Sequence, residues 1–276
     1  MQQVRPLVTV AIPVYNGEHE IKRAIDSVLS QTYTNFELII LDDVSTDQTM
    51  SVVRSYADPR LRIVEPPVKN LGYVGNFNRA VEASLGEYLK ILCHDDVLFP
   101  NAIKNQVDAL LKTSNQGVVM CTGLKRLVRP NGRVLPMRIG LKRHKGIINR
   151  SQAIKACARA GRNLIGETSV VLASRQAFLD AGTFATKYTL DLNMWFRILQ
   201  SGSCVVIDSD VSLFGLRSES GSANQQNSQA QQTIDLFRAL ERDEPRLIGP
   251  RLMVAMVVRS KINQVARRII FYTFGK

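Results

Sequence analysis

The fold is decided by Val8-Thr-Val-Ala-Ile-Pro-Val-Tyr-Asn-Gly-Glu18 and by Leu38-Ile-Ile-Leu-Asp-Asp-Val-Ser-Thr-Asp47. Each stretch begins as an apolar run of the β type and ends in polar, loop-forming residues. Between them, apolar residues recur at the spacing of one helix face, at Ile21, Ala24, Ile25, Val28 and Leu29. Together they predict a strand-helix-strand unit. Because ligands of open parallel sheets bind beyond the carboxyl ends of the strands, we expect Tyr15 and Asp43 to face one crevice.

Strand and helix continue to alternate along the first half. The predicted strands are residues 61–64, 88–92 and 118–122. An Asn- and Gly-rich loop at residues 70–78 leads into a helix that Gly86 ends, and Pro100 opens a helix to about residue 111. This alternation favours an α/β fold with a mostly parallel central sheet and flanking helices.

The second half is predicted with less regular patterns. They indicate a hairpin turn at Pro130-Asn-Gly132, a helix from about residue 151, a strand at 169–173, helices at 176–181 and 191–202, and a strand at 204–207. Residues 218–232 are rich in Ser, Gln, Asn and Ala, which is typical of a mobile loop or linker. A basic helical extension follows.

Composition bounds the class of protein. A chain of 276 residues, 45% apolar and 22% charged, fits one large domain or two tightly joined subdomains. Cys93, Cys121, Cys157 and Cys204 are widely spaced with no C-x-x-C pair, which indicates reduced thiols in a cytoplasmic protein. With no apolar run near the roughly 18–20 residues that cross a bilayer and no apolar signal core, membrane insertion is not expected.

The net charge of +12 predicts an anionic partner, which is a nucleotide diphosphate, a lipid headgroup or nucleic acid. Walker spacing and the G-x-G-x-x-G pattern are absent, so NTPases and dinucleotide-binding proteins have no support. Zinc-finger, RRM and helix-turn-helix patterns are absent as well, which leaves nucleic acid without a recognition motif.

Acidic groups follow predicted strands or open predicted helices at three places: Asp42 with Asp43, Asp95 with Asp96, and Asp191. Each has a structural interpretation, because Asp is a good helix cap and turn residue. Each also has a chemical one, because strand-end carboxylates face ligands and carboxylate oxygens are preferred by Mg²⁺ and Mn²⁺. The residues alone leave both interpretations open.

The order and spacing of these motifs over residues 7–222 resemble the family 2 inverting glycosyltransferases of the GT-A fold. The resemblance implies a GT-A type α/β fold. It implies a nucleotide-sugar-binding half at residues 1–112 and an acceptor-binding half at residues 113–217. Residues 218–276 are then predicted to be a linker and a basic helical tail.

The resemblance also implies how the nucleotide is held. Asp43 stands where the family accepts a hydrogen bond from the base, usually uracil N3–H, and Val44 replaces the usual glycine. Pro13 and Tyr15 match the residues that hold the base and stack on it, and a tyrosine face against a base contributes about 1–3 kcal/mol. The loop that supports ribose and phosphate matches Asn70, Gly72 and Asn78.

Cys93-His-Asp-Asp96 takes the place of the family's D-x-D-D metal motif, with Cys93 where the first Asp is expected. By position Asp95 is the main ligand of Mg²⁺ or Mn²⁺ and Asp96 the adjacent carboxylate. The alternative is that both carboxylates cap the helix that Pro100 opens. His94 is given no role.

Thr189-Leu-Asp-Leu-Asn-Met-Trp-Phe-Arg197 resembles the family's E-D-x-x-x-W-x-R helix start, with Leu190 replacing Glu. The resemblance assigns Asp191 as the general base that deprotonates the acceptor, a role that contributes roughly 10²–10⁴-fold to the rate. Glu167 is the next candidate. Asp191 can also cap its helix, and both roles can hold together.

The family often ends its catalytic domain with R-x-H-x-x-S-x-S, whose His can join the metal. Aligning Ser220-Gly-Ser222 with the last Ser pair puts Arg217 at the His. A guanidinium cannot ligate a cation but can pair with a diphosphate. Arg217 is therefore predicted to bind the nucleotide's diphosphate directly.

Two stretches are strongly basic. Residues 125–150 hold nine Lys and Arg without an acid, and seven more follow Glu244, again without an acid. Such runs are often solvated surface, but adhesion to an anionic membrane leaflet contributes about 1 kcal/mol per well-placed cation. Apolar residues lie between the seven cations that follow Glu244, and this pattern suits an interfacial helix. We therefore expect a cytoplasmic protein, peripheral at the inner face of the membrane, that binds no nucleic acid.

The leading hypothesis is an inverting glycosyltransferase of the hexosyltransferase type. It would transfer a sugar from a nucleotide-sugar, UDP-linked by resemblance, to a glycan or polyprenyl-linked acceptor in bacterial surface polysaccharide synthesis. The alternative is a nucleotide-sugar-binding protein without turnover, in which Cys93 and Arg217 mark a lost metal site.

Overall fold

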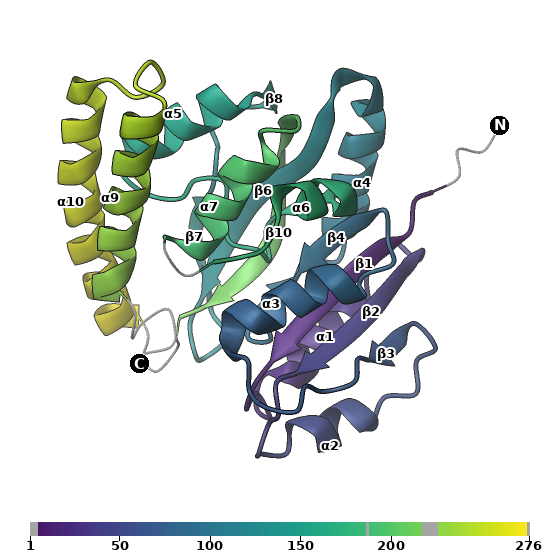
Figure 1. The fold of residues 1–276 in the computed structure, drawn as a ribbon. Coiled ribbons are helices and arrows are strands. Elements are labelled where there is room, and N and C mark those ends of the chain that lie inside the picture. The colour runs from purple at the N-terminus through teal and green to yellow at the C-terminus, as the bar shows by residue number, and fades with distance from the viewer. Residues whose placement is uncertain (1–4, 186–187, 217–225, 275–276) are drawn as a thin grey trace.

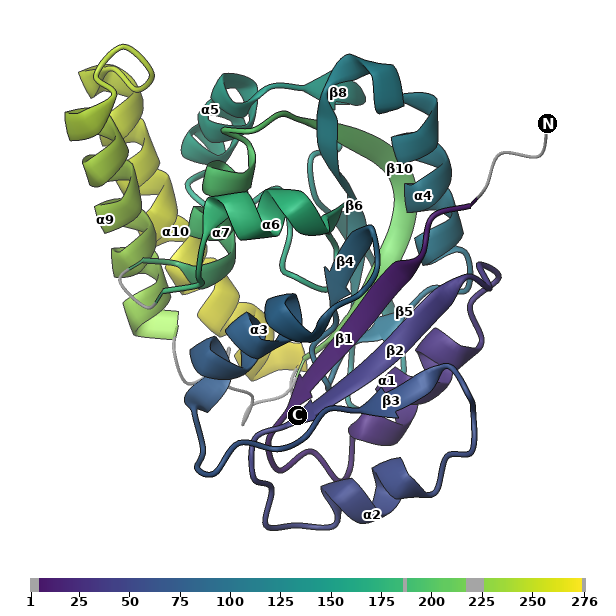
Figure 2. The same ribbon diagram turned by 45° about the vertical axis from the view of Figure 1, so that its right-hand side comes forward.

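The computed structural model describes residues 5–185, 188–216 and 226–274. The strands of these residues form one mixed sheet in the order β3-β2-β1-β4-β9-β6-β10-β5, with β7 paired to β6 and β8 to β10. Helices cover both faces of the sheet, and the C-terminal hairpin of α9 and α10 stands at one side (Figures 1 and 2). The predicted α/β fold with flanking helices is confirmed.

The first half is a parallel sheet. Its strands are β1 (Val8–Val14), β2 (Phe36–Asp42), β3 (Leu61–Ile63) and β4 (Tyr88–Ile91). They are linked by α1 (Ile21–Leu29), α2 (Thr49–Arg54) and α3 (Gly72–Ala83). Alternate residues of β1 enter different cores, because Ile12 packs in the cluster that holds Ile21 and Ala11 in the cluster that holds Ala80. Because β1 pairs in parallel with both β2 and β4, the carboxyl ends of these three strands meet at one edge of the sheet.

The second half extends the same sheet. Its strands are β5 (Val97–Leu98), β6 (Val118–Val128), β7 (Val134–Ile139), β8 (Gly146–Ile148), β9 (Leu172–Ser174) and β10 (Ser203–Gly215). The helices are α4 (Ala102–Lys112), α5 (Arg150–Ala160), α6 (Arg175–Ala181) and α7 (Leu190–Ile198), with a 3₁₀ turn at Ser114–Gln116. The β9 strand joins the two halves, because it pairs antiparallel with both β4 and β6.

Most of the second-half predictions are confirmed, with shifted bounds. The predicted hairpin turn links β6 to β7, where the Arg129 N–H donates to the Arg133 carbonyl. The strands at 118–122 and 204–207 are longer than predicted, because β6 and β10 pair in parallel along most of their length. The strand at 169–173 was placed too early, since turns formed by the N–H groups of Val170 and Val171 precede β9. The helix at 191–202 ends at Ile198, and its N-cap is Thr189 rather than Asp191.

The C-terminal region forms a hairpin of two helices, α9 (Gln226–Asp243) and α10 (Pro250–Phe274). The predicted linker is therefore wrong for residues 226–232, which are helical, while residues 218–225 lie outside the described residues. Ala and Gln are good helix formers, and α9 is anchored by Phe237, whose ring packs edge-on against Phe196 with centroids 5.9 Å apart. In the described part of the chain, no helix is long and apolar enough to span a membrane.

The hairpin packs tightly on α5. Arg150 donates two hydrogen bonds to the Glu244 carboxylate, over 2.7 and 2.6 Å. At the other end of α5, Gly161 has a φ of 63°, and a Cβ built on it would lie 2.5 Å from the Ser260 nitrogen. Only glycine fits this contact, so α10 approaches the body of the protein backbone to backbone.

Candidate active site

Asp43 joins the loops that follow β1 and β2. Its N–H donates to the Val14 carbonyl over 2.9 Å, and its Oδ1 accepts the Leu71 N–H over 2.8 Å. Asn70 donates to the Asp43 carbonyl and accepts the Gly72 N–H, both over 2.9 Å. The structure thus brings three predicted nucleotide residues, Asp43, Asn70 and Gly72, together at one edge of the sheet.

The neighbouring Asp42 has the structural role that its residue type also allows. Its Oδ2 accepts the Ser45 N–H over 3.1 Å. Asp47 likewise accepts the Thr49 N–H over 2.9 Å at the start of α2. Asp43 directs its carboxylate to the Leu71 backbone instead, so the two adjacent carboxylates have different partners.

Val44, which replaces the family's usual glycine, has a φ of 65°. A β-branched side chain rarely adopts this left-handed conformation, which costs about 1–2 kcal/mol. The backbone after Asp43 therefore keeps a shape that glycine would adopt without strain.

Three other predicted nucleotide residues lie at different depths. Tyr15 follows β1 and is 48% exposed, so its ring can be reached by a base. Pro13 is buried inside β1, in register with Leu41. The Asn78 amide holds the Phe184 backbone, accepting its N–H over 2.7 Å and donating to its carbonyl over 3.3 Å. Nucleotide contacts of these three residues stay predictions.

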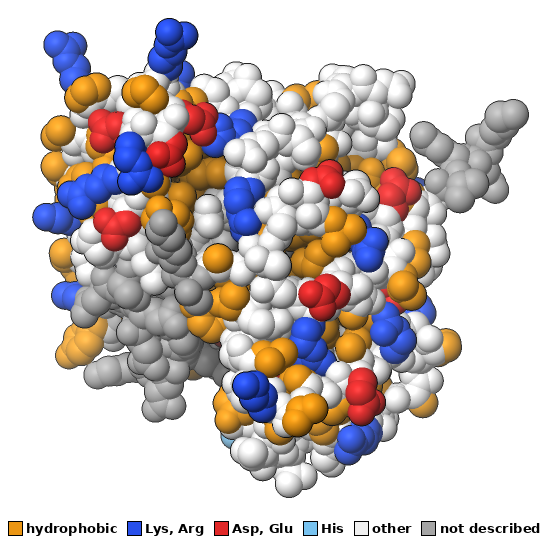
Figure 3. Space-filling model, viewed as in Figure 1, with side chains coloured by type: hydrophobic (Ala, Val, Ile, Leu, Met, Phe, Trp, Pro, Cys, Tyr) orange, Lys and Arg blue, Asp and Glu red, His pale blue; other side chains and the backbone are white. Residues whose placement is uncertain are grey.

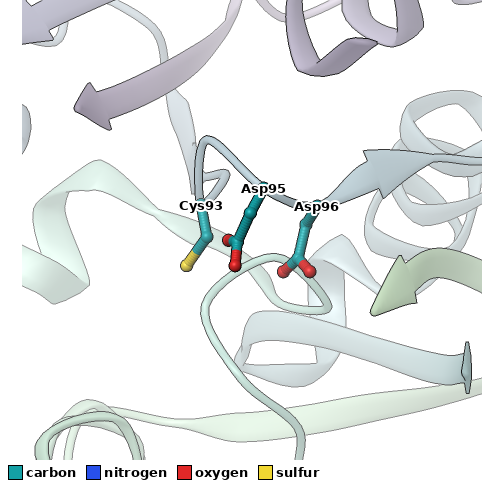
Figure 4. A group of neighbouring side chains, drawn as sticks. All are labelled: Cys93, Asp95 and Asp96. Atoms are coloured by element: carbon teal, nitrogen blue, oxygen red, sulfur yellow. The ribbon is translucent and has the colours of Figure 1, made fainter. Parts of the chain in front are cut away.

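Cys93, Asp95 and Asp96 point the same way from the loop after β4 (Figure 4), with ligand atoms within 4.8 Å of one another. Asp96 Oδ2 accepts the Ser169 hydroxyl over 2.5 Å, while its buried Oδ1 has no hydrogen-bond partner among the described residues. Burial, and then the charge of Asp95, raise the pKa of Asp96 well above its usual range. A divalent cation would satisfy this orphaned oxygen and both charges, so these residues fit a metal.

Cys93 offers a poor ligand for that cation. Burial raises the pKa of its thiol well above the usual value, and Mg²⁺ and Mn²⁺ prefer oxygen to sulfur. The Cys93 sulfur lies 3.7 Å from the Thr168 hydroxyl. The carboxylates of Asp95 and Asp96 are therefore the groups that would hold the metal.

Lys90 holds in place the segment that carries Ser169, whose hydroxyl is hydrogen-bonded to this loop. It is fully buried, and its Nζ donates to the carbonyls of Ser169 and Val171 over 3.1 Å each. Burial lowers the pKa of Lys90 to about 7. Ser169 in turn accepts the Cys93 N–H over 3.1 Å, so both β4 and the first residue of the motif are hydrogen-bonded to the 169–171 segment.

Asp191 lies in the first turn of α7. Its carboxylate accepts the Leu192 N–H over 2.7 Å and the Asn163 amide over 3.0 Å. Burial, and then the negative charge of Glu167, raise the pKa of Asp191 to about 6. Glu167 is ion-paired to Lys125, which holds the pKa of Glu167 below its usual value against the effect of burial. Asp191 is thus ionised near neutral pH yet more basic than an ordinary carboxylate.

A cavity of about 360 Å³ opens beside Asp191 and is also lined by Cys93. The candidate base and the metal loop therefore face one space. A further part of its wall belongs to the C-terminal helices, with Gln229, Thr233, Ser260, Asn263, Arg267 and Phe271. Arg267 is held there by a hydrogen bond to Gln229 Oε1 over 2.7 Å.

Sequence reasoning missed this wall. It placed these side chains in a linker and a surface tail, and no motif marks them. The sequence signal is weak, because the apolar residues of α10 lie on both its buried and its exposed sides and therefore do not mark one docking face. Arg217 lies outside the described residues, and its predicted contact with the diphosphate stays a prediction. Gly215, at the end of β10, lies beside the Asp95 loop.

Five of the nine cations of the basic run at 125–150 are in ion pairs in three dimensions. Asp208 and Asp210 of β10 bind cations of the run, including Arg138 through bonds of 2.9 and 2.7 Å. The cations of the run in ion pairs are Lys125, Arg126, Arg138, Lys145 and Arg150. The expectation drawn from a run without acids is corrected here, because the acids come from elsewhere in the chain. The run by itself therefore gives little support to a membrane surface.

Comparison with known proteins settles the family. The family model for glycosyl transferase family 2 matches residues 9–172. The chain belongs to this family. It is 31% identical over 217 residues to an uncharacterised glycosyltransferase of Rickettsia typhi, covering 75% of this chain and 62% of that protein. It thus spans less than two thirds of that relative's length.

The Escherichia coli protein WfgD, a UDP-Glc:alpha-D-GlcNAc-diphosphoundecaprenol beta-1,3-glucosyltransferase, is 28% identical over 73% of each chain. Among solved structures, the mannosyltransferase PcManGT from Pyrobaculum calidifontis, in complex with GDP-Man and Mn²⁺, is similar with a TM-score of 0.65. It covers 98% of this chain and 74% of its own, at 18% identity. TarS from S. aureus with UDP-GlcNAc gives a TM-score of 0.60 at 20% identity, over 75% and 58% of the two chains. These likenesses confirm the predicted GT-A type fold.

Proposed function

We propose that this glycosyl transferase family 2 chain is a metal-assisted, inverting glycosyltransferase of the hexosyltransferase type. The observation that carries the proposal is the shared cavity, because Asp191 and Cys93 of the metal loop line the same space. With a divalent cation held by Asp95 and Asp96 to bind its diphosphate, a donor would present its sugar to an acceptor hydroxyl near Asp191. The likeness to proteins solved with UDP-GlcNAc and with GDP-Man and Mn²⁺ supports a nucleotide-sugar donor.

The donor half would recognise the nucleotide by its base. Asp43 would accept the N3–H of uracil and Tyr15 would stack on the ring, with Pro13, Asn70, Gly72 and Asn78 shaping the pocket. Arg217 would pair with the diphosphate. A bound Mg²⁺ or Mn²⁺ would neutralise charge on the departing diphosphate.

Asp191 would take the proton of the attacking hydroxyl. The oxygen would form its bond to the anomeric carbon as the bond to the diphosphate breaks on the opposite side, which inverts the configuration. Asn163 and the Leu192 N–H fix the carboxylate for this transfer, and they leave the second lone pairs of its oxygens for the substrate. A single carboxylate is enough, because no covalent enzyme intermediate forms.

The acceptor would be a glycan or a polyprenyl-linked sugar of bacterial surface polysaccharide synthesis. The name of WfgD, which acts on a diphosphoundecaprenol acceptor, supports a lipid-linked molecule. We propose accordingly that the protein is cytoplasmic and peripheral at the anionic inner face of the membrane, where such an acceptor would be reached.

The test is a panel of nucleotide-sugars with and without Mn²⁺. We expect Mn²⁺-dependent hydrolysis or transfer with one UDP-sugar, lost in Asp95→Asn but kept in Cys93→Ala, because sulfur is not the expected ligand. Nucleotide-sugar binding without turnover, at every metal concentration, would favour the non-catalytic alternative. Turnover that EDTA leaves untouched would remove the metal and make Arg217 the better candidate for neutralising the diphosphate.

A further inference from the structure

The outer face of α10 carries a continuous row of exposed apolar side chains. They are Val254, Val258, Ile262, Val265, Ile269 and Tyr272, each between 52% and 74% exposed. Their spacings of four, four, three, four and three residues keep them on one side of the helix, over a length of about 27 Å. We call this set the outer row.

The outer row points away from the protein. The buried residues of α10, Met253, Met256, Ser260 and Phe271, occupy the opposite side and hold the helix against the rest of the fold. Residues of this inner side also line the cavity beside Asp191. One helix therefore has an inner face in the candidate active site and an outer face without a covering element among the described residues.

Cations flank the outer row. Arg251, Lys261 and Arg268 are exposed beside it, and the chain has no acidic residue after Glu244. Over the hairpin at the edge of the molecule, hydrophobic and Lys or Arg side chains are interspersed with Asp and Glu side chains (Figure 3), and in the described residues the acids of the hairpin belong to α9 and its C-terminal end rather than to α10. A second copy of the chain would bring like charges to both sides of the same seam, which opposes self-association. An anionic lipid surface complements both features, taking apolar side chains between the acyl chains and cations at the phosphates.

We propose that the outer row seats α10 lengthwise in the headgroup region of an anionic membrane. This inference rests on the membrane location proposed above and assigns it to one surface. Five of the nine cations of the basic run at 125–150 are engaged in ion pairs, and the run lacks a row of exposed apolar side chains like that of α10, so we assign the contact to the outer row. Docking through α10 would also place the wall of the active-site cavity next to the lipid surface from which a lipid-linked acceptor comes.

The experiment compares flotation with vesicles of phosphatidylglycerol and phosphatidylcholine in equal parts and with pure phosphatidylcholine. We expect the wild type to float with the vesicles that contain phosphatidylglycerol and not to bind those of pure phosphatidylcholine. The triple variant Val258→Ser, Ile262→Ser and Ile269→Ser should lose at least roughly tenfold in affinity, because each aliphatic side chain contributes to partitioning. The matched control, Val68→Ser with Leu85→Ser, also removes exposed apolar side chains but lies away from α10 and should bind as the wild type does.

A second measurement uses Ile262→Trp. The native Trp195 is buried, so a blue shift of tryptophan emission on adding anionic vesicles would report the new side chain entering the lipid. Equal binding by the triple variant and the wild type, or no emission shift, would overturn the assignment to α10. If the wild type binds no vesicles but forms a dimer, and the triple variant is a monomer, then the outer row contacts a second copy of the chain and the membrane proposal is overturned. Donor hydrolysis measured without vesicles should be the same in all variants, which separates this inference from the proposed chemistry.

Discussion

The candidate site has two sides, which we call the donor edge and the acceptor wall after the roles proposed for them, and the two are assembled in different ways. The donor edge uses loops that follow neighbouring parallel strands, so residues such as Asp43 and Asn70 meet because the sheet places them there. The acceptor wall combines Lys125 of β6, Glu167, Asp191 of α7 and Arg267 of α10, which no single local pattern connects. Groups at strand ends can thus be found from sequence, whereas a wall made by docked helices needs the structure. We expect the two sides to differ in function as well, and substitutions on each side test this.

The largest expected effect is on the acceptor side. Asp191→Asn keeps the shape and the helix turn but cannot accept a proton, so kcat should fall roughly 10²–10⁴-fold while nucleotide affinity is kept. In the wild type, kcat should decline as the pH falls below about 6, where Asp191 becomes protonated. Glu167→Gln should move this decline to lower pH, because it removes a negative charge that raises the pKa of Asp191. Steady-state kinetics against pH measures both, and near-normal kcat in Asp191→Asn would relocate the base.

The next effect is on stability at the same wall. Lys125→Met leaves the partly buried Glu167 without its cation, and we expect a loss of about 2–3 kcal/mol in the free energy of unfolding. Lys142→Met is the matched control from the same basic run, since Lys142 is exposed, and it should change stability by less than about 0.5 kcal/mol. Urea denaturation compares the two. Equal losses would mean that the run acts as one charged surface, contrary to the pairing described here.

The smallest effect is on the donor edge. Asp43→Asn keeps an oxygen for the Leu71 N–H but faces the base with a donor, so UDP should bind about 1–3 kcal/mol more weakly while stability is nearly unchanged. Calorimetry with UDP measures the affinity, and Asp42→Asn serves as the control from the adjacent turn. An unchanged affinity in Asp43→Asn would remove Asp43 from the donor site and with it the functional contrast between the two sides.

Much of the fold could be predicted from sequence because its signals are local. The strand-helix-strand start, the turn at Pro130-Asn-Gly132 and the helix that carries Asp191 each depend on residues close together in the chain. Val44 stands where the family usually has glycine, and its φ of 65° is one that glycine adopts without strain.

What the sequence could not show depends on partners far away. The pairing of Arg138 with Asp208 and Asp210 joins residues about seventy positions apart, so a run without acids looked like an open basic surface. The cavity wall from Gln229 to Phe271 depends on how two helices dock, and amphipathic periodicity does not name the docking partner.

The close contact at Gly161 determines whether the C-terminal hairpin can be exchanged in protein engineering. Because α10 rests on the bare backbone at this glycine, the hairpin and the core are matched at a contact with no side chain to adjust. Exchanging the hairpin with that of a relative would keep the donor edge intact and rebuild the acceptor wall, provided the incoming helix can sit equally close. A larger residue at this position in a relative would mark a hairpin that cannot be transplanted onto this chain.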